Sequence, residues 1–352
     1  MSNEKLTLED VRDQAKVKLK GICGVYKICD GDPSRLCQRH SYGGPLGIGG
    51  IGSGASFTNN VLALKKIKLK MRLVGETFEP DTSYSFFGNE LSMPIMAAST
   101  AGVTSFGGDG VITEEEFCKA VVLGCKDAGT IGWRGHSWNY SLETPHGLNA
   151  INDANGFGVK ICKPIEQEKI IQYYKKAEEI GAIAVGVDID GAGSVAMPKN
   201  GKPVYRKSPE DIRDLVKATS LPVIIKGVMT VEDAQIAMNA GAAAIVVSNH
   251  GGRVLDFTPG TADVLPKIAD AVKGKIKIIV DGGVRTGYDV LKMLALGAES
   301  VLIGRDIIRA AVGAGKLGVK LQMEHLMITL KKAMLMTNCK NLKEITSEVM
   351  ET

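Results

Sequence analysis

Regular alternation between short apolar runs and amphipathic stretches constrains the fold of this chain more than any other feature. The alternation begins after about residue 92 and continues until eight apolar runs have passed. Strands that alternate with helices form a parallel sheet, and eight such units favour an α/β chain closed into a (β/α)8 barrel over an open sheet. The expected strands are Pro94–Ala98, Gly129–Trp133, Gly158–Cys162, Ile183–Asp188, Val223–Lys226, Ala244–Ser248, Ile276–Asp281 and Ser300–Gly304.

Helices are expected between these strands, and several end at a glycine, as is common for helix C-termini. A long helix is also expected at Lys316–Met336, after the last strand. We therefore expect a barrel domain at 93–352 and an N-terminal extension at 1–92, with a helix at 4–20 and a glycine-rich loop at 43–54. The helices expected within the barrel are Thr113–Asp127, Gln167–Ile180, Pro209–Thr219, Val231–Ala240, Thr261–Val272 and Gly287–Leu296.

Composition and charge exclude some classes of partner. The chain has 352 residues with 44% hydrophobic and 23% charged residues, and its net charge of +4 is too small to indicate a nucleic-acid or membrane partner. Seven cysteines without a regular framework, and no leader segment, predict a cytoplasmic protein. Cys23, Cys29 and Cys37, with His40, could ligate zinc or an iron–sulfur cluster, but their spacing favours free or packed cysteines, so no metal is expected.

A nine-residue block, S-N-H-G-G-R-V-L-D, follows the sixth expected strand and runs from Ser248 to Asp256. It places a candidate base, His250, beside a candidate anion ligand, Arg253, with two glycines that allow a flat ligand to approach closely. Active sites of (β/α)8 barrels lie at the C-terminal ends of the strands, which is where this block falls. The alternative interpretation is a glycine-rich turn with a surface histidine and arginine.

Two turns near the C-terminus suit a phosphate group. Asp281, Gly282, Gly283, Val284 and Arg285 link the seventh strand to a helix, and Gly304 and Arg305 do the same after the eighth. Backbone amides at helix N-termini bind phosphate well, and the seventh and eighth units are its usual place in this fold. Two ordinary strand-to-helix turns remain the alternative.

Lys226 ends the fifth expected strand. A buried lysine costs desolvation free energy unless it meets an anion, and a reduced flavin is one suitable partner. The alternative is a lysine that reaches out to the rim of the barrel.

These motifs together resemble the FMN-dependent 2-hydroxy acid oxidase/dehydrogenase family, which includes glycolate oxidase and lactate oxidase. The resemblance runs from about Gly52 to the C-terminus and implies FMN as cofactor, a small 2-hydroxy acid as substrate and a homo-oligomer, with a tetramer suspected. Besides the blocks above, it is carried by Ser53-Gly54-Ala55, by Thr58, Asn59 and Asn60, by the segment Leu91–Ala101 and by Ile225-Lys226-Gly227.

The resemblance also implies a role for each matching residue. His250 would be the base, Asp190 would support its charged form, and Arg253 would bind the substrate's carboxylate. Lys226 would stabilise the reduced flavin. These roles fit the chemistry of an imidazole paired with a carboxylate and of a guanidinium that binds a carboxylate bidentately. The implied cofactor-binding residues are Ser99, Thr100, Ala101, Lys160, Asp188, Lys226, Ser248, Asp281, Gly282, Gly283, Arg285, Gly304 and Arg305.

The chain departs from the family in the substrate pocket. Gly50 stands where the family has a tyrosine, Met197 stands near the place of a second carboxylate-binding arginine, and the loop after the fourth strand is short. Lys160 and Cys162 align with a glutamine and a tyrosine. One arginine instead of two should weaken selection for small 2-hydroxy acids, and we expect Arg134 or Lys160 to compensate unless the substrate differs.

Two other functions stay open at this level. One is an FMN barrel of different chemistry, such as a type 2 isopentenyl diphosphate isomerase, and the pairing of His250 with Arg253 argues against it. The other is a non-catalytic flavin- or phosphate-binding protein. The sequence leaves open the exact substrate, the electron acceptor and whether electrons move as hydride or through a carbanion.

Overall fold

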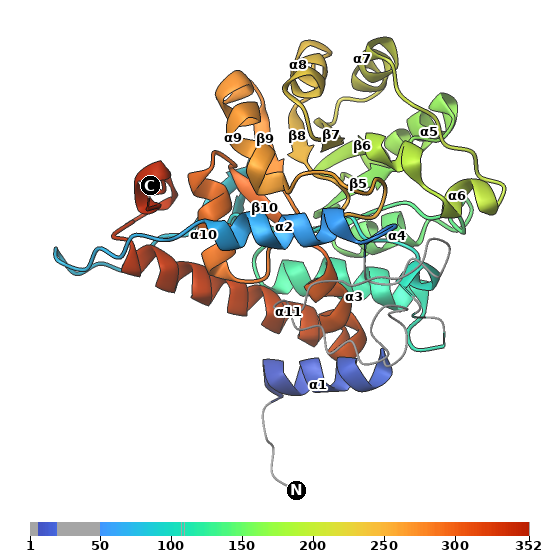
Figure 1. Ribbon diagram of the computed structural model, residues 1–352. Helices are drawn as coiled ribbons and strands as arrows, with labels where there is room; N and C mark the ends of the chain where they lie inside the picture. The colour runs from blue at the N-terminus through green and yellow to red at the C-terminus, as the bar shows by residue number, and fades with distance from the viewer. Residues whose placement is uncertain (1–5, 20–49, 107, 109, 352) are drawn as a thin grey trace, which may run out of the picture.

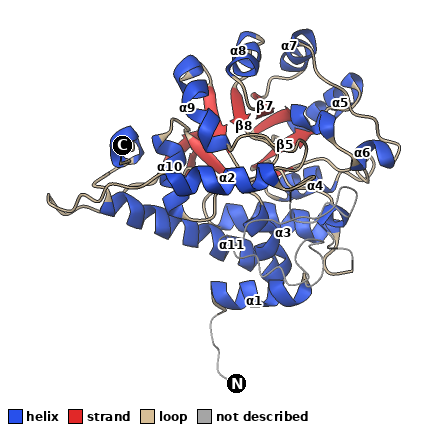
Figure 2. Cartoon of the chain, viewed as in Figure 1, coloured by secondary structure: helices blue, strands red, loops and turns tan. Residues whose placement is uncertain are grey.

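A computed structural model describes residues 6–19, 50–106, 108 and 110–351 of the chain. In these residues eight parallel strands close into a barrel in the order β10-β3-β4-β5-β6-β7-β8-β9, and helices surround it (Figures 1 and 2). The predicted (β/α)8 fold is confirmed. The strands are β3 (Ile95–Ala97), β4 (Gly132–Arg134), β5 (Gly158–Cys162), β6 (Ala184–Asp188), β7 (Val223–Val228), β8 (Ala244–Val247), β9 (Lys277–Val280) and β10 (Ser300–Ile303).

Six of the helices between the strands lie where the amphipathic stretches predict them, whereas the helices at His146–Asp153 and Ala196–Lys199 were not predicted. Gly129, Gly241 and Gly297 follow helix ends with φ of 74°, 90° and 110°, a backbone region that favours glycine. The helices are α3 (Glu114–Asp127), α4 (His146–Asp153), α5 (Gln167–Glu179), α6 (Ala196–Lys199), α7 (Pro209–Lys217), α8 (Val231–Asn239), α9 (Thr261–Val272), α10 (Gly287–Ala295) and α11 (Arg305–Met336).

The barrel interior follows from the two-residue period of the strands. Every second residue of each strand points inward, and Met96, Trp133, Ile161 and Val246 belong to one buried apolar cluster. A short antiparallel hairpin, β1 (Tyr84–Phe86) with β2 (Asn89–Leu91), adds apolar side chains to this cluster just before β3. The hairpin therefore closes the end of the barrel at which the strands begin and leaves the other end for ligands.

A second layer of helices covers one side of the barrel. α11 packs against α3 and α10, and α1 (Leu8–Lys18) packs against α11 (Figure 1). The expected helix Lys316–Met336 is present, joined to a preceding helical segment across non-helical backbone at Ala314 and Gly315. The described part of the chain holds no helix that is both long and apolar enough to span a bilayer.

Segment 50–106 contains a helix that the sequence did not predict, α2 (Ala55–Lys66), which packs against α9. The division of the chain at residue 92 stays a prediction. Cys23, Cys29, Cys37 and His40, for which metal binding was the less favoured interpretation, lie outside the described residues, as does most of the glycine-rich loop.

Candidate functional site

A cavity at the C-terminal ends of the strands is lined by residues from several of the loops that follow them. It holds about 1390 Å³ of atom-free space, part of it open to solvent. The predicted site residues that line it are Ser99, Thr100, Ala101, Lys226, His250, Arg253, Asp281, Gly282, Gly283, Arg285, Gly304 and Arg305.

Strand periodicity explains how charged side chains reach this end of the barrel. Asp188, Lys226, Ser248 and Asp281 each stand two residues beyond an inward-facing position on β6, β7, β8 and β9. Asp188 and Ser248 are buried beneath the cavity wall and contact the residues that line it. The barrel therefore ends in a ring of charges instead of a further apolar layer.

His250 lies in this ring with its imidazole bonded to a carboxylate. Its Nδ1 lies 2.9 Å from Oδ1 of Asp190, and its backbone nitrogen donates to Oγ of Ser248 at 3.0 Å. Its φ is 56°, followed by 62° and 79° at Gly251 and Gly252. A non-glycine residue in this region costs about 1–3 kcal/mol, which is most often accepted where the strained position serves function. The structure thus brings together the base and the carboxylate that the sequence paired.

The two carboxylates beside His250 have opposite pKa shifts. Burial, and then the charge of Asp188, raise the pKa of Asp190 to about 6. Burial of Asp188 opposes ionisation in the same way. Electrostatic interaction with His250, Lys163 and Lys226 outweighs that effect, however, and holds the pKa of Asp188 well below its usual range. Asp188 is therefore a permanent anion at neutral pH, whereas Asp190 loses its charge in mild acid.

Lys226 is surrounded by oxygen acceptors. Its Nζ lies 3.0 Å from Oγ of Ser248, 3.5 Å from Oδ1 of Asp188 and 3.6 Å from Oδ2 of Asp281. Burial opposes its charge, but the neighbouring carboxylates raise the pKa of Lys226 above its ordinary value. The ammonium is held charged at the floor of the cavity.

The loop that carries His250 is fastened to α2. The amides of Asn60 and Asn249 bond to each other in both directions, at 2.8 and 3.2 Å, and Asn60 also accepts from the backbone of Thr261 at 3.0 Å. A Cβ at Gly252 would lie only 2.4 Å from the backbone nitrogen of Phe57. The motif around Asn60 therefore holds the catalytic-end loops together, which gives this part of the resemblance a structural reason.

The turns predicted for phosphate binding lie at one end of the same cavity. Arg285 directs its guanidinium to Asp306 at 2.7 Å, while Arg305 stacks over the ring of Phe57 at 4.6 Å and donates to the carbonyl of Gly251 at 2.8 Å. The N-cap of α11 is Gly304, which has no side chain to cap the helix. Backbone amides at this helix start can therefore donate hydrogen bonds to an anion.

Buried polar atoms around the cavity support the fit of a polar cofactor. Among the described residues, Oγ1 of Thr100, Oδ1 of Asp281 and Nε of Arg253 are buried without a hydrogen-bond partner. Buried polar groups are normally satisfied, so atoms of this kind at a cavity wall indicate a bound polar ligand. The residues present fit FMN, whose phosphate, ribityl hydroxyls and ring offer both donors and acceptors.

Lys160 does not lie where the sequence alignment placed it. Its position on β5 has outward parity, its Nζ donates to the carbonyl of Gly135, and it lies 5.3 and 5.4 Å from the ring centres of Tyr140 and Tyr173. Arg134 also points outward, 4.9 Å over the ring of Phe117. Neither side chain lines the cavity, so neither stands where it could replace the second carboxylate-binding arginine.

The structure adds cavity residues that the sequence analysis did not assign to the site. Lys163 enters from the end of β5, two residues beyond inward-facing Ile161, and strand parity could have revealed it. His136 also lines the cavity, and burial, with Lys160 and Lys163 nearby, lowers its pKa well below the ordinary value. Met197 is confirmed as a neighbour of the cavity.

Asp188, Asp190 and His250 also form the group of potential metal ligands found in the described residues, with ligand atoms within 4.8 Å of one another. Ammonium groups lie 2.7 Å (Lys163) and 3.5 Å (Lys226) from Asp188. These cations already balance the carboxylate charge that a metal ion would need.

Known proteins provide an independent comparison. The model of the family described as FMN-dependent dehydrogenase matches residues 47–203 and 200–352. Glycolate oxidase 3 of Arabidopsis thaliana is 32% identical over 331 residues, covering 82% of this chain and 86% of the relative. For 2-hydroxyacid oxidase 1 of Homo sapiens the identity is 32% over 330 residues, with the same coverage. A crystal structure of mandelate oxidase with benzoyl-formic acid superposes with a TM-score of 0.76 and 26% identity over 97% of both chains.

Fold and site together define a (β/α)8 enzyme with a polar ligand cavity at the C-terminal ends of its strands. The chain belongs to the FMN-dependent dehydrogenase family. It is an FMN-dependent oxidoreductase, and both the family resemblance and the cofactor inferred from the sequence are confirmed.

Proposed function

We propose that the protein oxidises a small 2-hydroxy acid to the corresponding 2-keto acid. The observation that carries this proposal is the bond between His250 and Asp190, at 2.9 Å, beside a cavity that fits FMN. The names of the relatives, glycolate oxidase and 2-hydroxyacid oxidase, support the same substrate class.

His250 would take the proton from the substrate's hydroxyl. Asp190 accepts from Nδ1, which fixes the tautomer and leaves Nε2 as the acceptor that faces the cavity. When the ring gains a proton, the Asp190 carboxylate stabilises its positive charge. A base of this kind contributes typically 10²–10⁴-fold in rate.

Arg253 would orient the substrate. It lines the cavity three residues after His250, and its Nε is buried without a partner among the described residues. A guanidinium binds a carboxylate through two parallel hydrogen bonds, which places the neighbouring hydroxyl carbon at a fixed angle.

FMN, when bound, supplies the two-electron acceptor. We assign its contacts to Ser99–Ala101 and Lys226 around the ring and to the turns at Gly282–Gly283 and Gly304–Arg305 around the phosphate, because these residues line one continuous cavity. The charge of Lys226 would offset the negative charge that develops there on reduction.

The test is an anaerobic panel of 2-hydroxy acids, lactate and glycolate included, mixed with FMN-loaded protein. Loss of the flavin's visible absorbance with at least one acid is the expected result. A yellow protein that no acid bleaches would contradict the proposed substrate and favour another FMN chemistry. A protein that takes up no FMN would contradict catalysis altogether.

We also infer a cytoplasmic homo-oligomer, with a tetramer expected. The described cysteines Cys118, Cys125, Cys162 and Cys339 are all free, which suits a reducing compartment. Apolar side chains lie exposed on one extended segment and on the outer face of α11, which suits a subunit contact. They are Met71, Leu73, Val74, Ile328 and Leu335. Light scattering on the purified protein measures the assembly, and a monomer would contradict it.

A further inference from the structure

None of the roles assigned above explains why Lys163 lies in the site. Its Nζ lies 2.7 Å from Oδ2 of Asp188 and 3.4 Å from Nε2 of His250, and its side chain lines the cavity. We propose that Lys163 is the second cation of the substrate site and that, together with Arg253, it binds the substrate's carboxylate. This inference rests on the proposed function and specifies how the same site selects an acid.

The surrounding backbone is shaped to hold this lysine. A Cβ at Gly191 would lie 2.8 Å from Cδ of Lys163 and 2.8 Å from Cδ of Pro164, so only a glycine there leaves room for the lysine's stem. The side chain keeps 14% of its surface exposed, at the cavity. Lys163 is therefore held in one position with its charge directed at the ligand space.

The hydrogen bonds of Lys163 leave room for a ligand. The neighbouring Lys226 bonds to Ser248 at 3.0 Å and to Asp188 at 3.5 Å, and a second carboxylate, that of Asp281, lies 3.6 Å from its ammonium. Within the described residues Lys163 has two partners, the carboxylate of Asp188 and the imidazole of His250. One donor of Lys163 thus remains for an acceptor in the cavity.

The contact with His250 gives the lysine a further effect on the reaction. While Lys163 donates to Nε2, the electron pair that would take the substrate's proton is occupied. A carboxylate that binds Lys163 is a stronger acceptor than the imidazole and would draw the ammonium away. Binding of an acid would therefore free Nε2 of His250. An uncharged analogue of the same shape would draw the ammonium away less strongly and free the base less.

Charge balance favours the same assignment. Around His250, the carboxylates Asp188 and Asp190 lie beside the cations Lys163 and Lys226, and Arg253 lines the same cavity. Without Lys163 this part of the site would lose one positive charge, which would weaken its attraction for an anionic substrate. Lys163 therefore balances the buried carboxylate of Asp188 beside the base.

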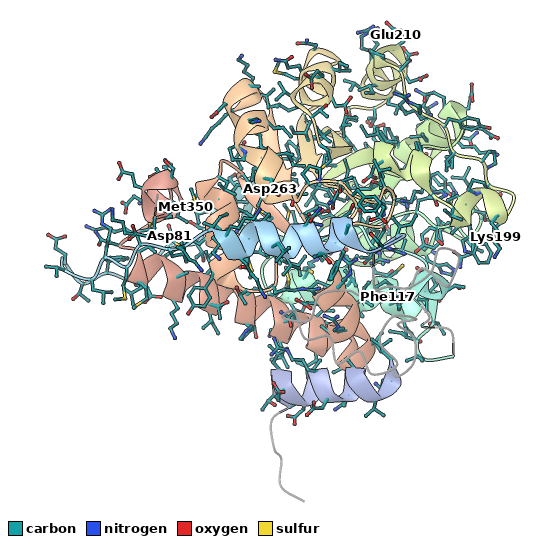
Figure 3. The ribbon with its side chains drawn as sticks, viewed as in Figure 1. Asp81, Phe117, Lys199, Glu210, Asp263 and Met350 are labelled. Atoms are coloured by element: carbon teal, nitrogen blue, oxygen red, sulfur yellow. The ribbon has the colours of Figure 1, made fainter. Side chains whose placement is uncertain are left out.

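The experiment compares an acid with its uncharged amide. Calorimetry on FMN-loaded protein measures the dissociation constants of pyruvate and pyruvamide, or of the keto acid and amide matching the best acid in the panel, since these ligands leave oxidised flavin unchanged. Lys163→Met and Lys163→Gln should reduce the preference for acid over amide by roughly 10- to 150-fold, the range of one lost charge-assisted hydrogen bond. Lys199→Met is the matched control, because Lys199 is exposed at the edge of α6 (Figure 3).

Each outcome is distinct. If the two Lys163 variants prefer acid over amide as strongly as the wild-type protein does, and keep its FMN content and melting temperature, the inference is overturned and the proposed function stays intact. An equal loss for acid and amide would show that Lys163 acts only as the counterion of Asp188. If the wild-type protein binds no keto acid, and no hydroxy acid bleaches it, the proposed function itself fails.

Discussion

Lys160→Met should make the protein more stable, although it removes a residue that the sequence placed at the cofactor. Burial, the largest cause, lowers the pKa of Lys160 to about 8 from its ordinary 10.5. At about 1.4 kcal/mol per pH unit, this difference means that the charged lysine costs the folded state about 3 kcal/mol at pH 7. The variant also loses the hydrogen bond to Gly135 and two ring contacts, which lowers its stability by about 1–2 kcal/mol. The expected net gain is about 1–2 kcal/mol, because methionine fills the same volume.

Urea unfolding of FMN-loaded Lys160→Met and wild-type protein measures this gain at several pH values. Below pH 8 the penalty is fully present. As the pH rises from about 8 to 10.5, folded Lys160 loses its proton before unfolded Lys160 does, so wild-type stability rises by about 3 kcal/mol and the variant should lose its advantage. Lys199→Met, an exposed control, should stay within about 0.5 kcal/mol of wild type. Loss of FMN in Lys160→Met, or a gain that does not depend on pH, would refute the reasoning.

Three further predictions concern the site. Wild-type activity should fall in mild acid as Asp190 gains a proton at its pKa of about 6. Asp190→Asn should therefore lower kcat/KM and remove the acid limb near pH 6 from the pH profile. An unchanged limb in the variant would exclude Asp190 as its origin. Gly252→Ala should lower the free energy of unfolding by more than about 2 kcal/mol, because φ is 79° and the new Cβ meets the Phe57 backbone; a wild-type urea midpoint would contradict the clash. Asn60→Ala should cost about 1–3 kcal/mol, because it removes both hydrogen bonds with Asn249 and leaves the buried backbone N–H of Thr261 without its acceptor. Calorimetric melting at wild-type temperature would show that α2 does not fasten the loop.

The periodicity of apolar residues and the positions of glycines predicted most of the fold. The strands alternate by two and the helices by 3.6 residues, and glycines such as Gly129 and Gly241 mark the junctions, so local sequence sufficed for the barrel. α2 and α4 were missed because the segments around them are rich in glycine, asparagine and threonine, which favour turns. The first residue of α4, His146, is half-buried beside Tyr140.

The site was predicted where a motif fixes a residue next to a strand end. His250, Lys226 and Asp281 were found in this way. Lys160 was misplaced because an alignment that slips by one residue exchanges the two faces of a strand. Lys163 has the opposite parity and so enters the cavity, where its partner Asp188 comes from the neighbouring strand β6. No sequence spacing encodes that pairing, because it depends on the register between β5 and β6, in which Cys162 stands opposite Val187.

The most direct test of the central claim replaces His250 by asparagine, a residue that tolerates its φ of 56°. The rate of anaerobic flavin reduction by the best 2-hydroxy acid is then measured in stopped flow on FMN-loaded protein. A protein that keeps its FMN but reduces it about 10²–10⁴-fold more slowly is the expected result. Reduction at the wild-type rate would contradict the account, since the substrate's proton would then be leaving to another group.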